Sequence, residues 1–154
     1  LDGGGGSLSF MNRLFKCVAV VVTACLIPFS AMAQEKIDVA TAFQKAQSGE
    51  TLLLDIRTPR EWKQTGIAPQ ATPLDMRSRT FGPELMSLID SNRERPIALI
   101  CATGGRSAYL AELMAGAGFT SVFDVTEGMI GSSAGPGWID AGLPVAAYSD
   151  LVTD

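Results

Sequence analysis

"PIALICATGGRSAYLAELMAGAG" (residues 96–118) joins a short apolar run to a glycine-containing loop and then to a helical pattern. The run 96–100 is too short for a helix and is typical of a buried parallel strand. Residues 107–118 predict a helix, because Leu110 and Met114 recur at helical spacing and glycines stand at the end. A buried strand that leads directly into a helix is the repeating unit of α/β folds.

The same alternation continues on both sides of this stretch. Thr58 and Glu61 form a capping box around Pro59, which predicts the start of a short helix. Further helices are expected over 39–46 and 82–91, and further strands over 51–56, 71–76 and 120–125. We therefore predict the α/β class, with a parallel sheet that carries helices on both faces, in one domain spanning about residues 35–150.

The composition of the chain limits the kinds of partner and site that we expect. The chain has 154 residues, enough for one domain with a core, and its net charge of −4 argues against a nucleic-acid partner. It contains no histidine, the commonest general base and the commonest transition-metal ligand in proteins. The three cysteines, Cys17, Cys25 and Cys101, form no C-x-x-C pair. We expect neither a metal centre nor a cofactor.

The first 33 residues are expected to lie outside the folded domain. Residues 1–10 are rich in glycine and resemble a linker or a scar left by cloning. Residues 11–33 have the pattern of a secretory signal: a basic start, an apolar stretch and "AMA" at 31–33. We predict cleavage before Gln34, a periplasmic or secreted location, and no stable membrane association after cleavage.

Two other interpretations of residues 11–33 remain open. The segment could be retained as a membrane anchor, although its apolar stretch is shorter than the about 20 residues that span a bilayer. It could also be a lipoprotein signal with Cys25 as the lipidated residue. In the cleaved form Cys101 would be the one cysteine left, and a lone exported thiol is either buried and inert or kept for its reactivity.

Cys101 stands where parallel sheets place their sites, at the carboxyl end of a strand. Gly104 and Gly105 allow a tight loop with several N–H groups directed inward. The amino end of the following helix and the cation of Arg106 add positive potential. Each of these features stabilises a thiolate, the nucleophilic form of cysteine. The alternative is a buried, unreactive cysteine at a strand end.

At this point the chain resembles the rhodanese family of single-domain sulfurtransferases. The family's loop, C-x-x-G-x-R-S, stands here as Cys101-Ala102-Thr103-Gly104-Gly105-Arg106-Ser107. Further similar segments are "LLDIRTPREW" (53–62), "TPLDM" (72–76), "GFTSVFDVTEGMIG" (118–131), Trp138 and "GLPV" (142–145). The resemblance implies that Cys101 accepts a sulfane sulfur as a persulfide. It also implies that the N–H groups from Ala102 to Ser107 hold the terminal sulfur.

The implied function is transfer of sulfane sulfur from a donor such as thiosulfate or a persulfide to a thiophilic acceptor. The expected partners are then a small sulfur-containing substrate or a thiol acceptor. The alternative is a non-catalytic rhodanese-like module that binds or senses a persulfide or a partner protein. A phosphatase or arsenate reductase is disfavoured, because the related phosphatases carry a loop one residue longer than the six residues from Cys101 to Arg106.

Residues outside the loop receive supporting assignments. Asp55 and Arg57 match the family's D-x-R and are expected to form a structural charge pair near the site. Arg77 and Arg79 are expected on the solvated surface, with the pocket mouth as the alternative. Many thiosulfate-using members carry a basic residue where this chain has Ala102.

The two tryptophans are expected to be structural. Trp62 is predicted to belong to the core. Trp138 is predicted to pack in the interior rather than to bound the pocket, although the glycine-rich stretch 131–138 is also a candidate for the pocket rim.

Overall fold

The computed structural model describes residues 34–151. The predicted linker (1–10) and signal segment (11–33), with Cys17 and Cys25, lie outside the described residues. Within residues 34–151, no helix has the length and apolar character needed to cross a membrane.

A single parallel sheet organises the described chain. Its strands are β1 (Glu35–Ile37), β2 (Leu52–Asp55), β3 (Thr72–Pro73), β4 (Ile97–Ile100) and β5 (Val122–Val125). They are arranged in the order β1-β5-β4-β2-β3, and every pair is parallel. All four residues of β4 and of β5 are buried, which explains why these strands are continuous apolar runs in the sequence. The predicted parallel α/β fold is confirmed.

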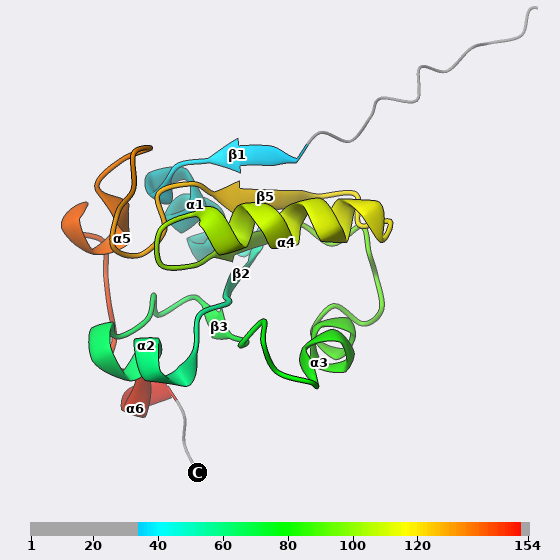
Figure 1. Ribbon diagram of the computed structural model, residues 1–154, viewed down its shortest axis with the longest axis horizontal. Helices are drawn as coiled ribbons and strands as arrows, with labels where there is room; N and C mark the ends of the chain where they lie inside the picture. The colour runs from blue at the N-terminus through cyan, green and yellow to red at the C-terminus, as the bar shows by residue number, and fades with distance from the viewer. Residues whose placement is uncertain (1–33, 152–154) are drawn as a thin grey trace, which may run out of the picture. The chain divides into compact units, whose positions relative to one another are not determined.

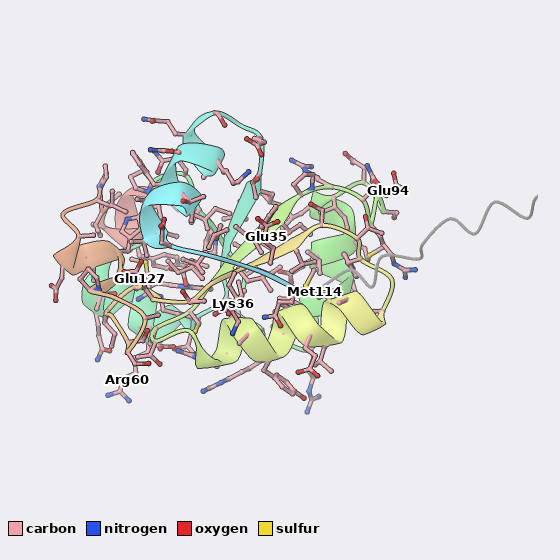
Figure 2. All side chains as sticks on the ribbon, turned by 90° about the horizontal axis from the view of Figure 1, so that it is seen from above. Glu35, Lys36, Arg60, Glu94, Met114 and Glu127 are labelled. Carbon is pink, nitrogen blue, oxygen red and sulfur yellow. The ribbon has the colours of Figure 1, made fainter. Side chains whose placement is uncertain are left out.

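Helices cover both faces of the sheet. They are α1 (Val39–Gln47), α2 (Pro59–Thr65), α3 (Phe81–Leu88), α4 (Gly105–Gly116), α5 (Gly137–Asp140) and α6 (Tyr148–Leu151). Figure 1 shows α4 in front of β5, and the view from above in Figure 2 shows α1 and α4 on opposite sides of β1. The two layers enclose two apolar clusters. One holds buried residues of α1, α2 and α5, and the other those of α3 and α4.

Several element boundaries differ from the sequence-based predictions. The helix predicted over 82–91 ends at Leu88, because the chain reverses through Asp90 and Ser91 at φ of 51° and 58°. The strand predicted over 71–76 pairs only at Thr72 and Pro73. Proline has no N–H to donate, which limits strand pairing there.

β1 was not predicted. It is an edge strand of three residues in which only Ile37 is buried, so it carries no recognisable alternation. The short helices α5 and α6 were also missed, because four residues are too few to show helical periodicity. α4, by contrast, begins at Gly105, two residues before the predicted start at Ser107.

Candidate active site

Cys101 lies directly after β4, and its residue surface is 1% exposed. The backbone around it is fixed by the segment that follows β5. The Cys101 carbonyl accepts the N–H of Met129 at 2.8 Å, and the Ala102 carbonyl accepts the N–H of Ile130 at 3.0 Å. The loop is therefore positioned by two neighbouring strands of the sheet, as the motif's place after a strand predicts.

Two glycines make this close approach of backbones feasible. Gly104 has φ of 83°, and a Cβ added to it would lie 2.1 Å from the carbonyl oxygen of Thr126. Gly128 has φ of 70°, and its Cβ would lie 2.4 Å from the Ala102 carbonyl oxygen. Side chains are excluded at both positions by conformation and by space.

Backbone and hydroxyl groups surround the Cys101 sulfur. Gly104 donates its N–H to Sγ at 3.2 Å, and the Ser107 hydroxyl oxygen lies 3.6 Å from Sγ. The Ser107 hydroxyl also donates to the Gly104 carbonyl at 2.9 Å. An N–H directed at sulfur favours the thiolate over the thiol.

The loop continues into the amino end of α4. The N–H of Ala108 makes the first turn's bond to the Gly104 carbonyl at 3.1 Å. The N–H groups of Gly105, Arg106 and Ser107 therefore precede the bonds that the helix makes within itself. Thr103 and Gly105 are exposed, so this end of the loop reaches solvent. Such a helix start can hold an anionic sulfur or a donor's charge.

The cation of Arg106, expected to add positive potential at the loop, is held in an ion pair. Its Nη1 and Nη2 donate to the Glu61 carboxylate at 3.0 Å and 2.5 Å. This pairing raises the pKa of Arg106 and lowers the pKa of Glu61 to about 2. Arg106 still lies within electrostatic range of Cys101. Its main contact, however, joins α4 to α2.

Glu61 therefore has two roles, of which the sequence revealed one. Its Oε2 accepts the N–H and the hydroxyl of Thr58 at 2.9 and 2.7 Å, which is the predicted capping box. The same carboxylate accepts the guanidinium of Arg106, 45 residues away in sequence. No local pattern could have indicated the second role.

The expected Asp55–Arg57 pair is present and fully buried. Arg57 Nε donates to Asp55 Oδ1 at 2.9 Å, and Nη2 donates to Oδ2 at 2.6 Å. Arg57 also donates to the hydroxyl of Thr65 at 2.7 Å and to the carbonyl of Gly66 at 2.8 Å. The pair thus fixes the end of α2 against β2.

The two tryptophans lie in the interior, and the two arginines that follow β3 lie on the surface. Trp62 and Trp138 are buried, and Trp138 Nε1 donates to the Pro144 carbonyl at 2.8 Å, so the packing predictions are confirmed. Arg77 and Arg79 are exposed, as expected of surface residues.

Two buried carboxyl groups next to this region were not predicted from the sequence. Glu127 accepts the N–H of Val39 at 3.2 Å and that of Gly137 at 3.0 Å, and so ties α1 and α5 to the end of β5. Asp124 lies within β5, and burial raises its pKa. A charged residue inside the apolar run "VFDV" was the available signal. Among the described residues, no group of three or more acidic or cysteine side chains is arranged to hold a metal ion.

Comparison with known proteins places this geometry in a family. An uncharacterized protein of Rickettsia prowazekii is 27% identical over 103 residues, which cover 63% of this chain and 84% of that protein. The polysulfide-sulfur transferase homodimer of Wolinella succinogenes shares the fold, with a TM-score of 0.59 and 22% identity, over 75% of this chain and 81% of that one.

A further solved structure is that of a Rhodopseudomonas palustris protein of unknown function, described as a possible tyrosine phosphatase. It is 27% identical, with a TM-score of 0.56, over 73% of this chain and 85% of that one. The rhodanese-like domain itself matches residues 39–132, which include the whole Cys101 loop. The chain belongs to the rhodanese-like domain family.

Proposed function

We propose that the protein is a sulfurtransferase that carries sulfane sulfur on Cys101. The observation that carries the proposal is the position of Cys101 Sγ. It lies at the start of a six-residue loop, accepts the Gly104 N–H at 3.2 Å, and stands beside the amino end of α4. A thiolate stabilised in this way attacks without a histidine base, and the chain contains none.

The reaction has two steps. The Cys101 thiolate attacks the outer sulfur of the donor, a new S–S bond forms, and the donor's own bond to that sulfur breaks. With thiosulfate the leaving electron pair departs on sulfite, which leaves a persulfide anion on Cys101. An acceptor thiolate then attacks the terminal sulfur, takes it as its own persulfide, and returns Cys101 to the thiolate.

The site favours a donor with little negative charge. Arg106 is paired with Glu61, and Ala102 supplies no cation where thiosulfate-using relatives often carry one. Each charge-assisted hydrogen bond that a dianionic donor lacks is worth roughly 1.5–3 kcal/mol. We therefore expect a high KM for thiosulfate, a lower KM after Ala102→Arg, and better use of a persulfide or polysulfide.

The decisive measurement is kcat/KM with thiosulfate, polysulfide and an aryl phosphate. The wild type is compared with Cys101→Ser, Arg106→Lys and Ala102→Arg, and mass spectrometry follows an adduct of about 32 Da, the mass of one sulfur atom. Cys101→Ser abolishes both transfer and adduct. Arg106→Lys impairs transfer, because lysine cannot form the two-pronged contact with Glu61. Equal adduct and equal turnover in wild type and Cys101→Ser would refute the proposal.

A second candidate is a non-catalytic module that binds or senses a persulfide or a partner protein. The specific observation in its favour is burial, because Cys101 is only 1% exposed. A stable adduct of about 32 Da on Cys101, formed without turnover of any donor, would favour this module. Turnover of the aryl phosphate would instead favour a phosphatase.

We also propose that this chemistry takes place in the periplasm or outside the cell. The support is the signal pattern of residues 11–33. Intact mass of protein from the cell envelope should give a chain that begins at Gln34. A membrane-bound form that still begins at Met11 would contradict this proposal.

A further inference from the structure

Asp124 is a buried carboxyl group that the chemistry above does not use. It lies in β5, where it is paired in register with Leu99 of β4 and Lys36 of β1. The residue is 1% exposed, and its Oδ1 has no hydrogen-bond partner. A buried polar atom without a partner costs free energy of folding, so its presence calls for an explanation.

The nearest polar group of α4 connects this carboxyl group to the candidate nucleophile. The Ser107 hydroxyl is completely buried. Its interaction with the Asp124 carboxyl group lowers the pKa of Asp124, whereas burial raises this pKa and is the larger effect. The same hydroxyl oxygen lies 3.6 Å from Cys101 Sγ. Ser107 has one hydroxyl proton and donates it to the Gly104 carbonyl at 2.9 Å. The Cys101 sulfur and the Asp124 carboxyl group are two further groups with which this hydroxyl interacts.

We infer that Asp124 is a positioning residue that controls the reactivity of Cys101 through Ser107. When Asp124 is ionised, it attracts the Ser107 hydroxyl away from the Cys101 sulfur. When Asp124 is protonated, this attraction is weaker, and the hydroxyl is left to the Gly104 carbonyl and the sulfur. The protonation of Asp124 therefore changes the reactivity of Cys101.

The charged surroundings of Asp124 support this assignment. Lys36 reaches toward the α4 side of β1 in Figure 2 and favours the charged form of Asp124 from an exposed position. β4 contributes the apolar Leu99, and α4 contributes Ser107. The buried Asp55–Arg57 pair belongs to the opposite face of the sheet, because Asp55 is in register with Ile100 of the other apolar cluster.

The inference rests on the proposed function only in taking Cys101 as the nucleophile. It is tested on the thiol itself, by iodoacetamide alkylation between pH 4 and pH 10, with no sulfur donor present. The proteins are wild type, Asp124→Asn, Ser107→Ala and the double variant. Glu112→Gln, which removes an exposed carboxylate from α4, serves as the matched control.

The expected signature is the ratio of the Asp124→Asn rate to the wild-type rate as a function of pH. The ratio is close to one at low pH, where Asp124 is neutral. It rises to about three- to tenfold once the pH exceeds the raised pKa of Asp124, because the ionised carboxylate draws the Ser107 hydroxyl away from the sulfur. Ser107→Ala reduces the Asp124→Asn effect, and Glu112→Gln follows the wild type throughout.

Two results would overturn the inference. A ratio that is constant across the pH range would show a purely structural effect of Asp124. An undiminished effect in the Ser107→Ala background would remove Ser107 from the coupling. Failure of sulfur transfer alone, with the pH-dependent ratio intact, would count against the proposed function and leave the role of Asp124 standing.

Discussion

Asp55 at the end of β2 and Asp124 in β5 are buried to nearly the same extent, at 0% and 1% exposed, on opposite faces of one sheet. Asp55 accepts hydrogen bonds from Arg57 Nε and Nη2 at 2.9 and 2.6 Å. Asp124 has an Oδ1 with no partner, and its nearest cation, Lys36, is exposed. Equal burial thus accompanies two different arrangements: one carboxylate in a buried ion pair, and one carboxyl group whose pKa is raised by burial.

The difference shows that the effect of a buried acidic side chain on stability depends on whether a cation is paired with it. Once a buried ion pair exists, removing one partner is costly, because the other charge stays buried and uncompensated. A buried carboxyl group whose charge is poorly compensated instead lowers stability whenever it is ionised. The first arrangement holds the fold together, and the second makes sense where a reactive group lies nearby, as Cys101 does through Ser107.

The largest expected effect is loss of stability when the paired carboxylate is removed. Asp55→Asn should lower the free energy of unfolding by about 3–5 kcal/mol, because Arg57 is left as a buried, uncompensated cation. Urea unfolding at pH 7 measures it. The double variant Asp55→Asn/Arg57→Met should recover part of the loss, since it removes both charges. If Asp55→Asn were as stable as Asp124→Asn at pH 7, the distinction between the two aspartates would be contradicted.

The second prediction concerns the close packing of backbone in the Cys101 loop, which lies on the same side of the sheet as Asp124. Gly104→Ala should cost about 2–4 kcal/mol, because alanine is strained at φ of 83° and its Cβ would lie 2.1 Å from the Thr126 carbonyl. Gly105→Ala is the control, since a Cβ there meets nothing within 4 Å. Thermal unfolding compares the two. Equal melting temperatures would show that the loop adapts without strain.

A third carboxylate, Glu61, is paired like Asp55 but about a quarter exposed, which gives an intermediate case. Its pKa is lowered to about 2 by the hydrogen bonds from Arg106, so the folded state releases its proton more readily than the unfolded state. The resulting stability is present above the unfolded value of about 4.5 and is lost as pH falls toward 2.

Because solvent screens this pair, Glu61→Gln should cost about 1 kcal/mol at pH 7 and almost nothing at pH 2. Urea midpoints of wild type and variant across that range give the difference. Lys63→Met, which removes an exposed charge from the same helix, is a suitable control. A difference that does not change with pH would contradict the assigned pairing.

The contrast between the aspartates also explains what the sequence could predict. Asp55 and Arg57 stand two residues apart in a family motif, so their pairing was expected and is present. Strands β4 and β5 and the Cys101 loop were also predictable, because apolar runs and glycines are local signals. The contact of Glu61 with Arg106 and the position of Asp124 beside Ser107 depend on strand order and helix packing, which no local pattern encodes.

The smallest expected effect has the opposite sign and concerns the stability of Asp124→Asn. Burial raises the pKa of Asp124, so the folded state holds this proton more tightly than the unfolded state does. Ionised Asp124 therefore lowers stability at neutral pH, and the penalty disappears as pH falls through the raised pKa toward the model-compound value of 3.8. Asparagine carries no charge, so the variant should be slightly more stable than wild type at pH 7, and the difference should shrink toward zero near pH 4. Urea midpoints at both pH values measure the difference, with Glu112→Gln as the exposed control on α4. A variant less stable than wild type at pH 7 would mean that ionised Asp124 has a favourable partner, and the contrast with Asp55 would then fail.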